Sequence, residues 1–211
     1  MNPLRFLFAS LFVFSACSSA APNVDLSGAW PTAPLKDEKA YYDTTEEWTR
    51  RGQVLSDFSE RKQQVLEVFA TLKSPKWNAA YIDFVSRRKL LPESEKQVLR
   101  QAAEGADHVE FAIFMSVDDR RSNDLHRGDR STWRIALVDD LGNETLPIEV
   151  VRVRRPQPVI RTEFPHFTQF HTVYLARFPV SATPFGRGKK RVTLKLASSR
   201  GGVQLEWRAS N

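Results

Sequence analysis

Cysteine is nearly absent from this chain, which has one cysteine, two methionines and four histidines among 211 residues. A single cysteine, Cys17, excludes any disulfide within the chain. An exported domain made from this sequence must therefore be held together by packing. Five tryptophans and fourteen phenylalanines supply large side chains for such a core.

Motifs for catalysis and for metal binding are also missing. The sequence has no Gly-x-Ser-x-Gly elbow, and it has no cysteine beyond Cys17 for thiol chemistry. His166 and His171 are five residues apart, but no helix or fixed turn would bring both to one zinc ion. We therefore expect no catalytic residues, no metal site and no cofactor, in a protein that is not an enzyme.

Long hydrophobic runs are lacking as well. The apolar stretch over residues 6–14 is shorter than the roughly 20 residues that a membrane-spanning helix needs. Arg5 places a positive charge before this stretch, and the small residues 15–16 follow it. This order is typical of a cleaved export signal, so we expect a signal peptide over residues 1–16.

The run Phe14-Ser15-Ala16-Cys17 resembles the lipobox of bacterial lipoprotein precursors. This resemblance implies that Cys17 receives diacylglycerol, becomes the mature N-terminus and anchors the protein to a lipid bilayer through acyl chains such as palmitate. Ser18 is similar to the signal for sorting to the outer membrane. The alternative is an ordinary signal peptide cleaved after Ala21, which would remove Cys17 with the leader.

Positive charge gathers toward the C-terminus. Residues 151–211 contain twelve Lys or Arg and two Glu, whereas the net charge of the whole chain is only +6. The densest run comprises Arg187, Lys189, Lys190 and Arg191 at a predicted turn. Such a run suits an anionic envelope component or a protein partner, and nucleic acid is not expected at this location. Alternatively, these cations only keep a β-domain soluble and blunt its edges.

The N-terminal half is expected to hold a tether and then helices. Residues 17–43 contain several prolines and little periodicity, which predicts a tether between membrane and domain. Residues 44–105 are predicted to form a helical segment that Ser74-Pro75 and Pro92 interrupt. The apolar residues at helical spacing in its first part are Trp48, Leu55, Phe58, Val65, Leu66, Phe69 and Leu72.

From residue 106 onward the apolar period changes to two. Residues 106–211 are therefore predicted to form an antiparallel β-sandwich of immunoglobulin-like topology, with the helical segment packed on it in an α+β fold. Trp133 and Trp207 lie in phase with aliphatic neighbours, which predicts that both are buried. The predicted strands fall near residues 109–117, 133–137, 146–153, 159–162, 171–178, 191–197 and 203–208.

The loop 118–132 and the strand ends beside it are rich in charge. Four arginines alternate there with four aspartates around one glycine, which suits either an internal network of ion pairs or a binding surface. Together with Asp139 and Asp140, these aspartates could offer oxygen ligands to calcium, although Asp is also favoured in turns.

These observations together predict a lipid-anchored protein of the bacterial cell envelope that binds or scaffolds. Two alternatives stay open. The first is a structural subunit of an envelope assembly. The second is an envelope hydrolase, which would need a cleft with a charged dyad.

Overall fold

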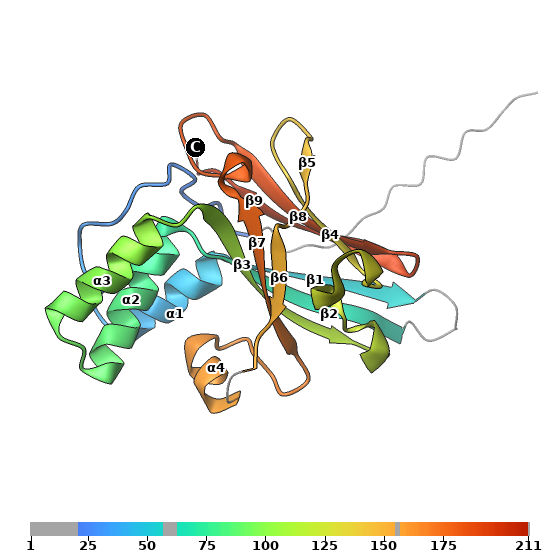
Figure 1. Cartoon of the computed structure of the whole chain (residues 1–211), viewed down its shortest axis with the longest axis horizontal. Coiled ribbons are helices and arrows are strands. Elements are labelled where there is room, and N and C mark those ends of the chain that lie inside the picture. Colours follow the sequence, from blue (N-terminus) through green and yellow to red (C-terminus); the bar gives the residue numbers. More distant parts are fainter. Residues whose placement is uncertain (1–20, 57–62, 155–156, 211) are drawn as a thin grey trace, which may run out of the picture.

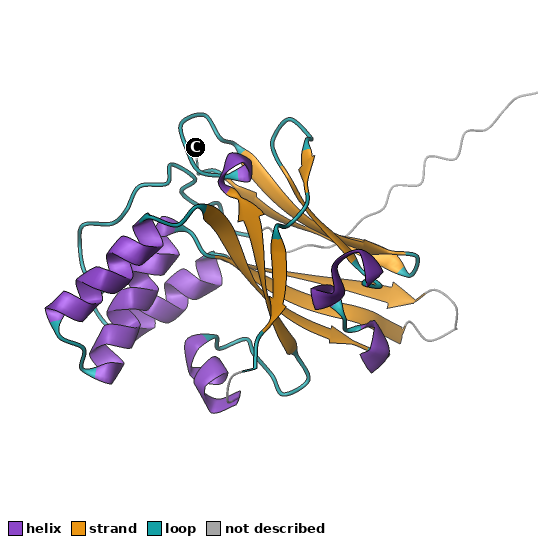
Figure 2. Cartoon of the chain, viewed as in Figure 1, coloured by secondary structure: helices purple, strands orange, loops and turns teal. Residues whose placement is uncertain are grey.

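A computed structural model describes residues 21–56, 63–154 and 157–210. The described residues form a mixed α+β fold with two antiparallel sheets, and helices α1 to α3 lie together beyond one end of the sheets (Figures 1 and 2). In chain order the elements are α1 Glu38–Glu47, β1 Thr49–Ser56, β2 Gln63–Leu72, α2 Pro75–Lys89, α3 Glu93–Glu104, β3 His108–Val117, η1 Arg120–Ser122, η2 Leu125–Arg130, β4 Arg134–Val138, β5 Glu144–Thr145, β6 Glu149–Arg152, α4 Gln157–Glu163, β7 Thr172–Pro179, η3 Val180–Ala182, β8 Arg191–Ser198 and β9 Gly201–Arg208.

One sheet has the strand order β1-β2-β3-β7-β6, and the other has the order β5-β4-β8-β9. The two sheets meet where β1 lies against β9. The Arg50 guanidinium on β1 donates through Nε to the carbonyl of Glu206, 2.8 Å away. Gly52 allows this approach, because a Cβ there would lie only 3.0 Å from the Leu205 side chain. Two antiparallel sheets joined in this way are compatible with a sandwich.

The core lies between the sheets and is dominated by aromatic rings. Trp133 and Trp207 are fully buried, which confirms the phase predicted for their strands. Phe111 on β3 packs edge-on against Trp207, with ring centroids 5.4 Å apart. Strand β3 is covered on both faces, because Phe114, on its opposite face, packs against Phe164 after α4 at 4.8 Å.

The expected helix through residues 44–72 is wrong. Helix α1 ends at Glu47, and the chain then forms the antiparallel pair β1 and β2. The spacing of the apolar residues resembled that of a helix because consecutive β2 residues such as Val65 and Leu66 are both buried. The strict alternation typical of a strand is therefore lost. A short buried strand of this kind cannot be told from a helix by periodicity alone. The five-stranded sheet thus combines strands from both sides of the predicted boundary at residue 105.

The other predicted elements agree in part. Helices α2 and α3 follow Ser74 and Pro92 as predicted, and the Ser74 side chain caps α2 by accepting from the Trp77 N–H. The strand predicted at residues 159–162 is wrong, because that segment is helix α4. Of the six other predicted strands, those at residues 109–117, 133–137, 171–178, 191–197 and 203–208 are present as β3, β4, β7, β8 and β9, and the one predicted at residues 146–153 is present only as the shorter β6.

Most of the predicted tether is part of the folded unit. Val24 and Leu26 are buried, and Val24 forms a parallel bridge with Ala209. Further along, the Leu35 N–H donates to Oδ2 of Asp83, at 2.8 Å, and α1 begins at Glu38. The expectation that the domain begins near residue 44 is therefore wrong. Cys17 and the predicted signal peptide lie outside the described residues.

Candidate functional site

The predicted basic run forms the turn that leads into β8, and we call Arg187, Lys189, Lys190 and Arg191 the basic turn. Its backbone is fixed at both ends. The Gly186 N–H donates to the Leu26 carbonyl at 2.9 Å, and the Lys190 carbonyl accepts from the Ala209 N–H at 2.8 Å. Gly188 has φ +82°, a conformation that favours glycine, so a side chain there would strain the turn.

The cations of the basic turn are largely open to solvent. Arg187, Lys190 and Arg191 are exposed, and Lys189 is half-buried. None of the four forms an ion pair within the part of the chain that the structure describes. Asp139 is bound mainly by Asn143, whose side chain lowers the pKa of that carboxyl, and the more distant Lys189 lowers it slightly further. The turn therefore presents nearly its full charge to solvent.

The N-terminal segment reaches the domain at the same edge. The Val24 N–H donates to the Arg208 carbonyl, and the Val24 carbonyl accepts from the Ser210 N–H, both at 2.8 Å. Two residues before Val24, the Pro22 carbonyl accepts a hydrogen bond from Nη2 of Arg50, 2.7 Å away. Burial lowers the pKa of the Arg50 guanidinium to about 10, which leaves it protonated at neutral pH.

The loop 118–132 is organised from within by one buried carboxylate. Oδ1 of Asp124 accepts from the Thr132 N–H at 2.9 Å and from the Ser131 hydroxyl at 3.0 Å. The Tyr174 hydroxyl donates to the carbonyl of Asn123 at 2.6 Å, which ties the loop to β7. Among the described residues, no arginine of the loop pairs with an aspartate of the loop, and Asp118 pairs instead with Arg200 at 2.6 Å, outside the loop. The internal ion-pair network considered from the sequence is therefore not formed.

The aspartates considered as calcium ligands have separate structural tasks. Asp139 accepts from the backbone N–H groups of Leu141 and Asn143 within its own turn, at 2.9 and 2.8 Å. Asp119 accepts from the Arg121 N–H at 3.0 Å. In residues 21–56, 63–154 and 157–210, no three His, Cys, Asp or Glu side chains gather in a way that could hold a metal ion.

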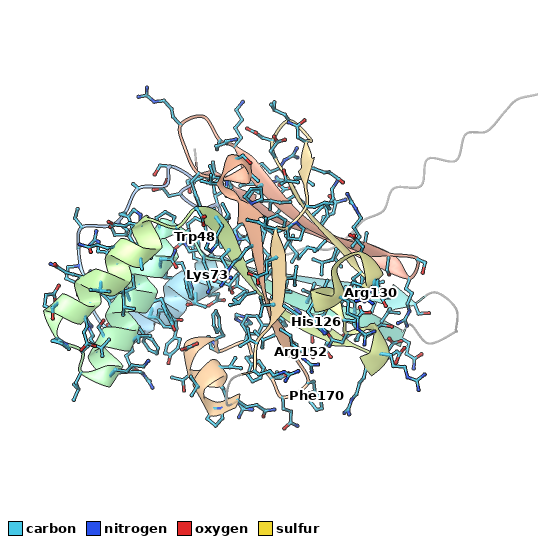
Figure 3. The ribbon with its side chains drawn as sticks, viewed as in Figure 1. Trp48, Lys73, His126, Arg130, Arg152 and Phe170 are labelled. Atoms are coloured by element: carbon cyan, nitrogen blue, oxygen red, sulfur yellow. The ribbon has the colours of Figure 1, made fainter. Side chains whose placement is uncertain are left out.

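A second group of exposed cations lies around η2 and β6. We call Arg127, Arg130, Arg152 and Arg154 the loop cluster, and each is exposed. The His126 ring stacks on Tyr174 at 6.0 Å, and Figure 3 shows His126, Arg130 and Arg152 in this region. Burial raises the pKa of Tyr174 to about 12, against the opposing effect of nearby Arg152 and Arg127. No local sequence pattern joins Arg152 and Arg154 to this loop.

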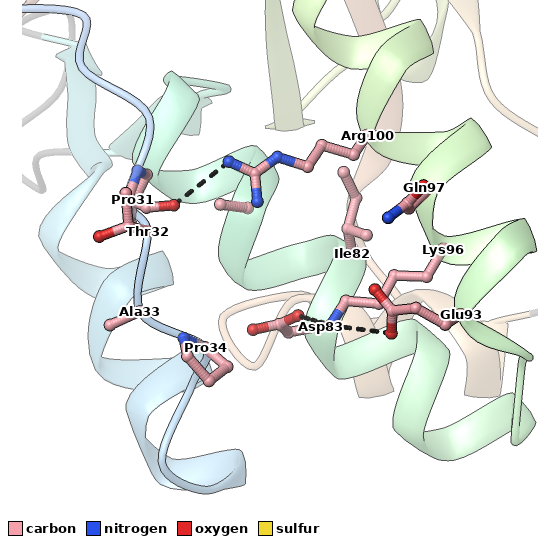
Figure 4. Close-up of a pocket in the computed structure, with 11 residues that line it drawn as sticks. Pro31, Thr32, Ala33, Pro34, Ile82, Asp83, Glu93, Lys96, Gln97 and Arg100 are labelled. Carbon is pink, nitrogen blue, oxygen red and sulfur yellow. Dashed lines mark hydrogen bonds and ion pairs between the residues drawn. The ribbon is translucent and has the colours of Figure 1, made fainter.

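Two hollows lie beside the helices, and their charged groups are already paired. The first, of about 290 Å³, lies between residues 31–34 and helices α2 and α3 (Figure 4). Within it, Asp83 pairs with Lys96 at 2.7 Å, and Nη2 of Arg100 donates to the Pro31 carbonyl at 3.4 Å. These bonds fasten the N-terminal segment to the helices.

The second hollow, of about 430 Å³, lies between α2, α3 and the start of β3. Glu110 at its edge pairs with Lys73 and with Arg177, the latter at 2.8 Å. Burial alone would raise the pKa of Glu110, but these two cations outweigh it and the pKa is lowered. Glu110 is therefore held ionised in a structural network rather than prepared to transfer a proton.

The histidines that were considered for zinc lie in an aromatic layer over the five-stranded sheet. His166 stacks on Phe69 at 5.2 Å and meets Phe114 edge-on at 4.6 Å. Burial lowers the pKa of His166 to about 3, so the ring stays neutral. Nδ1 of His171 accepts from the Thr168 N–H at 3.0 Å. His166 thus serves as a packing group, whereas Nε2 of His171 also lies 3.7 Å from Oε2 of Glu67.

Comparison with protein-family models, with curated proteins and with solved structures finds no match to this chain. Among the described residues, no helix has the length and apolar character required to cross a membrane.

Proposed function

We propose that this chain is a lipid-anchored protein of the bacterial cell envelope, in the outer membrane, which binds or scaffolds an anionic envelope component through the basic turn. The observation that carries the proposal is the absence of any ion pair to Arg187, Lys189, Lys190 and Arg191 among the described residues. Exposed cations without ion pairs attract an anionic surface, and they lose little of their hydration when they approach it. In this proposal, acylation at Cys17 supplies the membrane anchor. The immunoglobulin-like topology of the two sheets remains a prediction.

The paired charges elsewhere favour binding over catalysis. Glu110 and Asp83, the most buried carboxylates beside the two hollows, are each engaged by a lysine. An envelope hydrolase would need a free acid or base with access to substrate. A structural subunit of an envelope assembly is the second candidate, because the loop cluster offers another exposed charged surface on which a protein partner could bind.

The test uses the full exported chain with Cys17→Ser, which removes the acyl anchor. We expect it to bind lipopolysaccharide micelles and phosphatidylglycerol vesicles at low salt and to dissociate as salt rises, because a Debye length falls from about 10 Å at 0.1 M to about 3 Å at 1 M. Replacing the four cations of the basic turn by Gln should remove most of this binding.

The matched control replaces the four cations of the loop cluster by Gln, so that net charge changes equally. This control variant should bind like the parent. If the basic-turn variant binds as well as the parent, the basic turn is only a solubilising turn. If instead the control loses binding, the surface lies at the loop cluster. A stoichiometric protein partner isolated with the intact protein would favour the assembly subunit.

A further inference from the structure

The basic turn and the point where the chain leaves toward Cys17 belong to one edge of the domain. Ala209 joins them, because its N–H donates to the Lys190 carbonyl while its strand neighbours bond to Val24. Arg191 is paired in register with Arg208, so the first residue of β8 lies beside the last residue of β9. We call the basic turn together with residues 22–26 the anchor edge.

The free chain between the proposed anchor and this edge is short. Five residue steps separate Cys17 from Pro22, and even a fully extended chain spans at most about 3.6 Å per residue, or about 18 Å. Pro22 is held in place by the buried Arg50. A protein anchored at Cys17 therefore keeps Pro22, at one end of the anchor edge, within about 18 Å of the lipid headgroups, which is about two Debye lengths.

We propose that the anchor edge faces the bilayer that holds the acyl chains, and that the basic turn binds the phosphate groups of anionic lipids in that same membrane. This inference rests on the proposed acylation of Cys17. The combination of acyl chains with a basic patch is a known physical route to stable membrane attachment, because the two contributions add. The expected tether over residues 17–43 is thereby shortened to the few residues before Pro22.

The course of β8 indicates which surface lies far from the anchor edge. Strand β8 begins at Arg191 in the anchor edge and ends at Ser198, and its Ala197 pairs with Arg134 at the start of β4. The turn after β8 is therefore about 20 to 25 Å from the anchor edge, at roughly 3.3 Å per residue. Helix η2 of the loop cluster precedes β4 and lies at this distant end. The loop cluster is thus left facing the solvent or a partner.

The test compares two labels on the acylated full chain in vesicles of phosphatidylglycerol and phosphatidylcholine. One fluorophore is attached at Ser210→Cys, beside Val24, and the other at Ser199→Cys, in the turn after β8; both positions are exposed. With a quencher on the lipid headgroups, we expect quenching at residue 210 to exceed that at residue 199 several-fold at low salt. Gln at the four positions of the basic turn should reduce this contrast, whereas Gln at the loop cluster should preserve it.

Equal quenching at the two positions at low salt, or stronger quenching at residue 199, would overturn the proposed orientation. So would a contrast that is unchanged in the basic-turn variant. The N-terminal mass of the same sample reports acylation separately, so failure of the anchor is distinguishable from failure of the orientation. The Cys17→Ser chain, bound to the same vesicles at low salt, should give the same contrast without any acyl chain.

Discussion

Removing the Trp207 ring should destabilise the protein more than other changes to its core, because this ring joins the two sheets. Trp207 is completely buried, and its Nε1–H donates to the Trp48 carbonyl at 2.9 Å. Its ring contacts Phe111, and the Arg50 guanidinium lies 5.5 Å from its centroid. One side chain thus connects β9 with β3 and β1.

The expected cost follows from these contacts. Trp207→Ala should lower the free energy of unfolding by about 3–5 kcal/mol, which is a large part of the roughly 5–15 kcal/mol that holds a typical domain together. Trp207→Phe keeps most of the apolar volume but leaves the Trp48 carbonyl without its donor. It should cost about 1–3 kcal/mol.

The assay is equilibrium unfolding in urea followed by far-ultraviolet circular dichroism, which does not depend on the deleted indole. Phe170→Ala is the matched control, because that ring is 72% exposed and its removal should cost under about 0.5 kcal/mol. If Trp207→Ala does not fold, Trp207→Phe still gives a value. A loss below about 1 kcal/mol for Trp207→Ala would contradict the assigned role of the ring.

Two further predictions concern pH and the loop 118–132. Because burial depresses the pKa of His166 to about 3, the unfolded chain takes up a proton near pH 6.5 that the folded chain excludes. Stability should therefore be full above pH 6.5 and fall by about 2 kcal/mol by pH 5, and His166→Phe should flatten that slope in urea titrations between pH 7 and 5. An unchanged slope would show that the ring is accessible to protons in the folded state. Asp124→Ala should cost about 1–3 kcal/mol and hasten proteolysis within the loop, whereas the exposed Asp129→Ala should do neither; equal behaviour of the two variants would refute the role of Asp124.

The sequence predicted those parts of the fold in which one face of an element is buried. The alternation on β8 and β9 and the phase of Trp133 and Trp207 were correct for this reason. Strand β2 was missed because both of its faces are covered, so that its apolar residues follow no period of two. Helix α4 was missed because it is only seven residues long and begins next to a proline.

The candidate site was predictable in composition but not in position. Four cations within five residues are visible in the sequence as a solvated turn. Their place beside Val24 depends on a contact between residues more than 160 positions apart, which no local pattern encodes. The same holds for the loop cluster, in which Arg127 and Arg152 both lie near Tyr174 because η2 packs beside β6.

The proposed function and the proposed orientation at the membrane both require that Cys17 carries the membrane anchor. Mass spectrometry of the mature N-terminal peptide, taken from the protein in its own envelope, tests it directly. We expect an N-terminal cysteine with a diacylglyceryl group on its sulfur. A mature chain that begins with a free amine at Ala20, Ala21 or Pro22 would contradict it.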